Sequence, residues 1–230
     1  VYDHATERSR ILARLLDGVE CLAFLQNDAW LATGDRGGTI QLWPLIGDEN
    51  EDHGHGQETF PRWQAHDSRV TALAVSPDGS QLVSGCRDGH MRCWSASPRP
   101  CRWIIGGAGG ETNDFAFSPD GKRLAVARES GLELWDLETR QQLSTCAETT
   151  GPWRTVAIAP KEDVLIAGSA QGDIVAWQLD PFEELARWSS PKFAAWERMV
   201  FSPSGRRFAA AAWDRVEEVW IFDLDTPQTT

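Results

Sequence analysis

Short apolar runs separated by tight turns recur along the chain, and the stretch from 70 to 94 shows the pattern most clearly. It contains three runs: Val70–Val75, Gln81–Ser84 and Met91–Trp94. The first two are joined by Ser76-Pro77-Asp78-Gly79, a turn in which proline fixes φ and glycine accepts a positive φ. The pattern predicts three consecutive antiparallel strands. Because one such meander would be only marginally stable, its repetition along the chain matters.

The same unit returns at a nearly constant spacing. The turn at Ser76 reappears at Ser118 after 42 residues, as Ala159-Pro160-Lys161 after 41 more, and as Ser202-Pro203-Ser204-Gly205 after a further 43. A period near 40 with several strands per unit predicts an array of β-propeller blades. An aromatic residue closes the third strand of each unit: Trp43, Trp94, Trp135, Trp177 and then Phe222, or Trp220 in another register.

Two further motifs point to a family. Leu134-Trp135-Asp136-Leu137 and Ala65-His66-Asp67, together with the Ser-Pro-Asp-Gly turns, resemble WD-repeat proteins. The resemblance covers essentially the whole chain in five copies. It implies an all-β propeller of four-stranded antiparallel blades, and it says little about function because this fold hosts many unrelated roles.

The repeats divide the chain into five units preceded by a partial one. Residues 1–18 align with the end of a third strand and an outer strand, so we expect them to belong to a preceding blade. Residues 47–59 are polar and acidic, which predicts an exposed loop insertion, and residues 227–230 predict a frayed tail. The five repeats span about 19–45, 60–95, 101–137, 141–179 and 184–225.

The number of blades in the complete ring stays open at this point. Residues 10–15 can complete the last blade beside residues 219–222 and close a five-bladed ring, which would hide the sheet edges. Val1-Tyr2-Asp3 instead resembles the end of a further blade, and most members of the family resemble seven-bladed rings. We favour a piece of a larger propeller and keep the closed five-bladed ring as the alternative.

Composition narrows the possible partners and the compartment. The formal net charge of −12 argues against nucleic acid or an anionic membrane, because both require a basic surface. No apolar run approaches the roughly 20 residues of a membrane-spanning helix. The five cysteines form no CxxC pair, which predicts structural thiols in a reducing, cytoplasmic compartment.

Motifs for catalysis or cofactor binding are missing from the sequence. The glycine run at 106–110 lacks the nucleotide-binding patterns, so we expect a linker. His53 and His55 lie in the acidic segment and can bind a divalent metal, but two histidines in a loop give no fixed coordination geometry. We therefore expect a non-catalytic protein with no cofactor and no metal.

The family resemblance also implies a structural role for some polar residues. In the family pattern a histidine, an aspartate and the tryptophan of the third strand form a hydrogen-bonded set within a blade. Only the second repeat matches this set nearly in full, with His66, Asp88 and Trp94.

A candidate binding surface follows from tryptophans that the repeat pattern does not require. Trp153 and Trp196 align with the residues that begin the first strands of other repeats, and Trp213 lies in a hairpin of the last repeat. The resemblance places these positions at one rim of the central channel, and tryptophan with arginine is typical of binding hot spots. The alternative is that the rings cap the channel and pack on one another. The nearby arginines are Arg36, Arg69, Arg87, Arg128, Arg154 and Arg215.

These observations support two hypotheses of function. The first is an interaction scaffold or sensor module that binds a partner protein or peptide, or other domains of a larger parent chain, through the channel rim. The second is a small-molecule-binding or catalytic propeller with a site in the channel, for which Glu129, Glu197 and Asp214 are the available acids.

Overall fold

The computed structural model consists of β-strands and the turns between them. It describes residues 2–3, 8–9, 18–25, 29–45, 60–95, 99–105, 110–146, 151–161, 163–189, 195–212 and 219–224. Within these ranges there is no helix, and therefore none that could cross a membrane.

The strands form consecutive antiparallel sheets, which we number blades 1 to 5. Blade 1 contains β3 (Val19–Leu25), β4 (Trp30–Asp35), β5 (Thr39–Pro44) and β6 (Arg62–Gln64). Blade 2 contains β7 (Val70–Val75), β8 (Gln81–Cys86), β9 (Met91–Ser95) and β10 (Arg99–Ile105). Blade 3 contains β11 (Thr112–Phe117), β12 (Arg123–Arg128), β13 (Leu132–Asp136) and β14 (Gln141–Cys146).

The last two blades continue the same order. Blade 4 contains β15 (Trp153–Ile158), β16 (Val164–Ser169), β17 (Asp173–Leu179) and β18 (Phe182–Ser189). The described strands of blade 5 are β19 (Trp196–Phe201), β20 (Arg207–Ala212) and β21 (Val219–Asp223). At the N-terminus β1 (Tyr2–Asp3) pairs with β2 (Arg8–Ser9).

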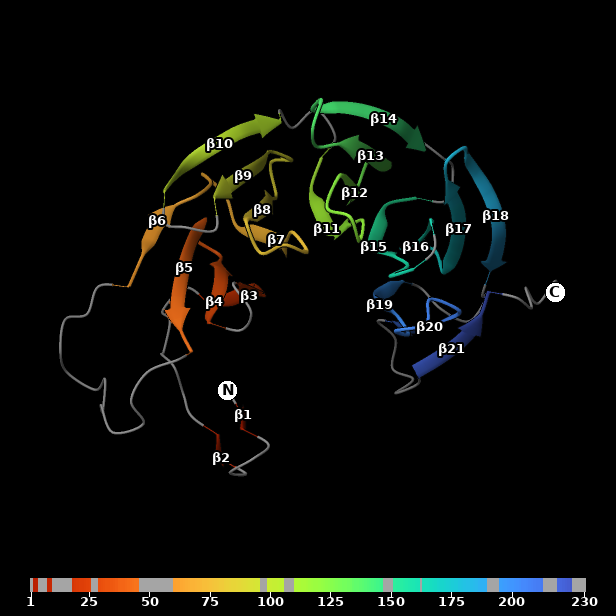
Figure 1. The fold of residues 1–230 in the computed structure, drawn as a ribbon, viewed down its shortest axis with the longest axis horizontal. Coiled ribbons are helices and arrows are strands. Elements are labelled where there is room, and N and C mark those ends of the chain that lie inside the picture. Colours follow the sequence, from red (N-terminus) through yellow and green to blue (C-terminus); the bar gives the residue numbers. More distant parts are fainter. Residues whose placement is uncertain are drawn as a thin grey trace.

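The five blades stand side by side in an arc (Figure 1). Their first strands, β3, β7, β11, β15 and β19, lie nearest the centre, and each contacts the first strand of the next blade along the chain. The last strands β10, β14 and β18 follow the outside of the arc. This is the arrangement of propeller blades, so the predicted all-β fold is confirmed.

The aromatic residue that closes each third strand occupies one position of the register. Trp94 lies opposite Leu82, and the aromatics of the other blades hold the equivalent place. In blade 5 this residue is Phe222, opposite Phe208, whereas Trp220 lies opposite Ala210. Trp43, Trp94 and Trp177 are buried, and Trp135 and Phe222 are half-buried. Burial of such rings between sheets explains why a large aromatic residue recurs at the same spacing.

Small residues allow the blades to approach closely near the centre. A Cβ atom added at Gly34 would lie 2.7 Å from Val70 of the next blade, and one added at Gly85 would lie 2.6 Å from Thr112. A Cβ atom added at Gly168 would lie 2.7 Å from the Cβ atom of Trp196 in the following blade. The second strands of blades 1, 2 and 4 therefore carry glycine where the first residue of the following blade packs against them.

The Ser-Pro-Asp-Gly turns are stabilised by their own side chains. Asp78 Oδ1 accepts hydrogen bonds from Ser76 Oγ at 2.5 Å and from Ser80 N at 3.0 Å. These bonds from Ser76 and Ser80 lower the pKa of Asp78 to about 2. Asp120 repeats the arrangement in blade 3.

Blade 5 has Ser204 at this aspartate position, and Ser204→Asp is expected to raise the free energy of unfolding by about 0.5–1 kcal/mol. Ser204 Oγ lies 3.1 Å from Ser202 Oγ and 3.4 Å from Arg206 N, both longer than the contacts of Asp120. A carboxylate would shorten these bonds because charge-assisted bonds are stronger. Urea denaturation measures the change, with Ser204→Ala as the control. Equal stability of the two variants would contradict the role given to the carboxylate.

The two ends of the arc expose apolar side chains. Leu22 and Phe24 of blade 1 are exposed, as are Val200, Val219 and Ile221 of blade 5. In Figure 1 the arc is open between these two blades. The predicted closing strand at 10–15, the acidic segment at 47–59, most of the 106–110 glycine run and the 227–230 tail lie outside the described residues, so the number of blades stays a prediction.

Candidate functional site

The first hairpin of every blade contains a bulge one residue after its first paired position. In blade 3, Thr112 lies opposite Arg128 and Asp114 lies opposite Ala127, so Asn113 is the extra residue. A bulge of this kind re-aims a side chain and interrupts the ladder. The five extra residues, one from each blade, are Glu20, Thr71, Asn113, Arg154 and Glu197.

Several of these residues line a cavity between the inner strands. The cavity has a volume of about 600 Å³ and is lined by residues of β3, β7 and β11 together with Arg198 of β19. Its lining includes the charged residues Glu20, Asp114 and Arg198 and the apolar residues Leu22 and Leu73. Five of its ten lining residues are polar or charged, so a cavity of this size suits a ligand with polar groups beside an apolar part.

Asp114 is the most constrained charged group of this cavity. Its Oδ2 accepts hydrogen bonds from Thr155 Oγ1 at 3.0 Å and from Val156 N at 3.1 Å, both in blade 4. Its Oδ1 lies 3.8 Å from Nη1 of Arg198, across the cavity from blade 5. The Asp114 side chain is 20% exposed and that of Arg198 is 69% exposed.

Burial raises the pKa of Asp114, while the N–H group of Val156, the positive charge of Arg198 and the Thr155 hydroxyl oppose the rise. The ionised carboxylate is therefore less stable here than in water. A cation that reaches its Oδ1 atom would relieve that cost. Burial also raises the pKa of the nearby Cys21 thiol to about 12, which makes it a poor nucleophile.

The structure corrects the expectation that Trp153 and Trp196 present their rings to a partner. Their alignment is right, because each is the first paired residue of its inner strand. Trp153 is 0% exposed, however, and its ring lies 5.4 Å from that of Trp177 in an edge contact. Trp196 is 1% exposed and packs against Phe222. Both rings fill the space between blades. Trp213 and Arg215 lie outside the described residues.

Arg128 is likewise unavailable to a partner. Its side chain is 1% exposed, and its Nε lies 3.1 Å from Glu133 Oε2. Its Nη1 donates hydrogen bonds to Gly89 O at 2.6 Å and to Thr112 Oγ1 at 3.1 Å. Because Gly89 belongs to blade 2, Arg128 joins two blades.

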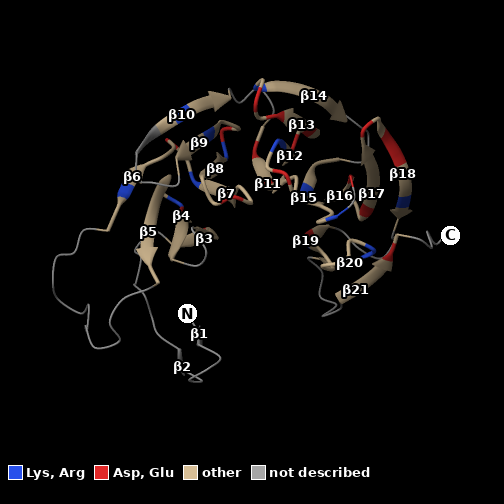
Figure 2. Ribbon diagram, in the orientation of Figure 1, with Lys and Arg blue, Asp and Glu red and all other residues tan. Residues whose placement is uncertain are grey.

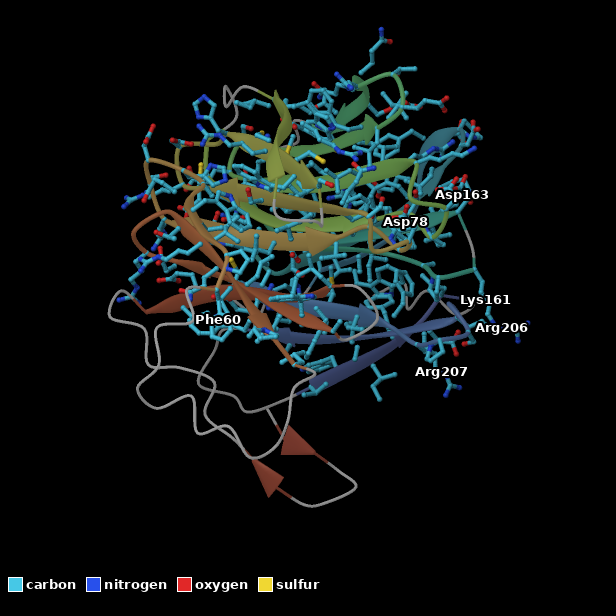
Figure 3. The ribbon with its side chains drawn as sticks, turned by 60° about the vertical axis from the view of Figure 1, so that its left-hand side comes forward. Phe60, Asp78, Lys161, Asp163, Arg206 and Arg207 are labelled. Atoms are coloured by element: carbon cyan, nitrogen blue, oxygen red, sulfur yellow. The ribbon has the colours of Figure 1, made fainter. Side chains whose placement is uncertain are left out.

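Three of the predicted arginines remain exposed on one rim. We call the rim where the inner strands begin the entry rim, and the opposite one, with the Ser-Pro-Asp-Gly turns, the turn rim. Arg36, Arg87 and Arg154 lie on the entry rim, and Arg36 forms an ion pair with Glu20. Among the described residues, Arg87 and Arg154 have no carboxylate within ion-pair distance. Figure 3 labels residues of the turn rim, including Asp78, Lys161 and Arg206.

The predicted polar set of the second repeat is present in altered form. Ser84 Oγ lies 2.7 Å from His66 Nε2 and accepts a hydrogen bond from Trp94 Nε1 at 2.8 Å, so this serine, which the sequence did not single out, joins the two. Asp88 accepts a hydrogen bond from His90 N instead of joining His66. Burial and the charge of Arg92 lower the pKa of His66 to about 4, so its imidazole is neutral at neutral pH.

The sequence missed Asp114 and Arg198. A signal was available, because the equivalent register positions of other blades hold Cys21, Ala72 and Thr155, none of them charged. Of the acids proposed for a catalytic channel, Glu129 is exposed, Glu197 is half-buried, and Asp214 lies outside the described residues. Within the described part of the chain, no three His, Cys, Asp or Glu side chains gather at a potential metal site.

Comparisons with known proteins agree on one family. The model described as "WD domain, G-beta repeat" matches residues 12–44 and 57–95. Pre-mRNA-processing factor 17 of Homo sapiens is 27% identical over 168 residues, covering 70% of this chain and 29% of that protein. Small ribosomal subunit protein RACK1y of Oryza sativa subsp. japonica is 27% identical over 173 residues, covering 71% of this chain and 48% of that protein. Telomerase protein component 1 of Rattus norvegicus is 25% identical over 226 residues, covering 96% of this chain and 8% of that protein. The chain thus spans less than half the length of these curated relatives.

Proposed function

This chain belongs to the WD-repeat family, and on that premise we propose that it is a non-catalytic interaction module that holds a segment of a partner protein on its entry rim. The observation that carries the proposal is the pair of exposed arginines, Arg87 and Arg154, on that rim. Arginine is enriched at binding hot spots and pairs with carboxylates through two parallel hydrogen bonds. The partner segment would therefore carry acidic side chains opposite the two arginines.

The chemistry of the rest of the molecule supports binding over catalysis. Burial raises the pKa of Cys86 to about 11 and that of Cys93 to about 12, so neither thiol is an activated nucleophile. None of the five cysteines forms a disulfide in the structure, which supports a cytoplasmic location as a further proposal.

A protein partner also suits the charge distribution better than a nucleic acid does. Basic and acidic residues are interspersed along the described arc (Figure 2), and the net charge is −12. A phosphate backbone requires a continuous basic surface, whereas a short acidic segment requires only local pairing.

The test is binding of fluorescently labelled acidic peptides, selected from an array, measured by anisotropy. Arg87→Glu together with Arg154→Glu is expected to weaken binding about tenfold or more, because two attractive contacts become repulsive. Arg206→Glu on the turn rim is the matched control and is expected to leave binding unchanged. An equal loss in the control, or no peptide that binds the wild type, would overturn the proposal.

A further inference from the structure

The cavity between the inner strands presents two opposite charges to the same space. We propose that it binds a small zwitterionic ligand of the α-amino acid class, whose ammonium group contacts Asp114 and whose carboxylate contacts Arg198. The inference concerns the cavity and not the rim arginines, so it stands or falls independently of the proposed partner-binding role.

The carboxylate of Asp114 is held in place before any ligand arrives. Thr155 Oγ1 and Val156 N both donate to Oδ2, which fixes the orientation of the group from the neighbouring blade. The Oδ1 atom accepts a hydrogen bond from Phe115 N at 2.9 Å and also faces Arg198. A recognition group fixed in this way loses little conformational entropy on binding, which favours affinity for a small ligand.

Arg198 retains free donors at the other side of the cavity. The distance of 3.8 Å between its Nη1 and Asp114 Oδ1 is too long for a hydrogen bond. No described residue accepts a hydrogen bond from Arg198, and its side chain is 69% exposed. The other N–H groups of its guanidinium can therefore bind a carboxylate while Nη1 stays beside Asp114.

The spacing of the two charges matches an α-amino acid. In such a molecule the ammonium nitrogen and the nearer carboxylate oxygen are about 3 Å apart, since only two bonds separate the nitrogen from the carboxyl carbon. Asp114 and Arg198 are 3.8 Å apart, so each can face its opposite charge on one ligand. A simple cation would leave Arg198 unmatched, and a simple anion would face the carboxylates of Asp114 and Glu20.

The remaining wall of the cavity indicates which amino acids fit. Val19, Leu22 and Leu73 are apolar lining residues, so an apolar or aromatic side chain on the ligand would be buried against them. The volume of about 600 Å³ leaves room for a side chain as large as that of phenylalanine.

The first experiment titrates the full chain with L-phenylalanine and L-leucine by isothermal calorimetry. Saturable binding is expected, with L-phenylalaninamide and N-acetyl-L-phenylalanine at least about tenfold weaker, because each lacks one of the two charges. Absence of saturation up to about 10 mM, or binding of either analogue as tight as that of L-phenylalanine, would overturn the proposal.

The second experiment assigns the charges to residues. Arg198→Gln is expected to weaken L-phenylalanine binding about tenfold while leaving the amide unaffected, since the amide carries no carboxylate. Asp114→Asn is expected to weaken both, and urea denaturation verifies that each variant is folded. Arg206→Gln, an exposed arginine of the turn rim that does not line the cavity, is the control. If Arg198→Gln binds L-phenylalanine as the wild type does, the assignment is wrong.

Discussion

Trp153→Ala is expected to lower the free energy of unfolding by about 3–5 kcal/mol, the usual cost of removing a fully buried large aromatic side chain. The Trp153 ring is 0% exposed and packs with Trp177, Leu134 and Leu165 between blades 3 and 4. Its removal would leave a cavity that the two rigid sheets cannot close. Urea denaturation followed by tryptophan fluorescence and circular dichroism measures the loss.

The neighbouring residue provides a control for this prediction. Arg154 is exposed, so Arg154→Ala is expected to change stability by about 0.5 kcal/mol or less. The pair separates a core role from a binding role at adjacent positions. If Trp153→Ala leaves the free energy of unfolding unchanged but abolishes partner binding, Trp153 belongs to the binding surface and the prediction is wrong.

Arg128→Ala is expected to cost about 3–5 kcal/mol, because it leaves a largely buried carboxylate without its partner. Glu133 is 15% exposed, and its Oε2 lies 3.1 Å from Arg128 Nε while accepting a hydrogen bond from Trp135 Nε1 at 2.8 Å. The substitution also removes the bond to Gly89 O that ties blade 3 to blade 2. Thermal and urea denaturation measure the change.

A double-mutant cycle with Glu133→Gln isolates the ion pair. Glutamine retains an acceptor for Trp135 but carries no charge, so Arg128→Ala is expected to be less costly in that background than in the wild type. Arg123, whose partners Asp163 and Asp180 are exposed, offers a comparison at the surface. Its replacement is expected to cost about 1 kcal/mol or less. Equal costs for Arg128 in both backgrounds would show that the Gly89 contact dominates.

The fold was predictable because its determinants are local and repeated. The Ser-Pro-Asp-Gly turns specify where each first hairpin reverses, and an aromatic residue at constant spacing specifies which side chain lies between sheets. The predicted alignment of Trp153 and Trp196 with Val70 and Thr112 is also right, because each of the four is the first paired residue of its inner strand.

Side-chain environment was not predictable in the same way, because it depends on the neighbouring blade. Trp153 starts a strand like Thr112, but only the packed arc shows that its ring enters the core. Arg128 is charged and follows an apolar strand, so sequence favours exposure; Glu133 and Gly89 O are what allow its burial. Asp114 and Arg198 are 84 positions apart in the chain, and only the curvature of the arc brings them together.

The extra residue at the bulge of each first hairpin takes no part in the apolar packing between blades. The five extra residues belong to none of the apolar clusters between blades, and they stand outside the regular ladder. Thr71 and Asn113 nevertheless donate hydrogen bonds to main-chain oxygens of the next blade, at Thr112 and Trp153. Positions 154 and 197 are therefore the better places to vary, and a small library there would change the central surface while keeping these bonds between blades.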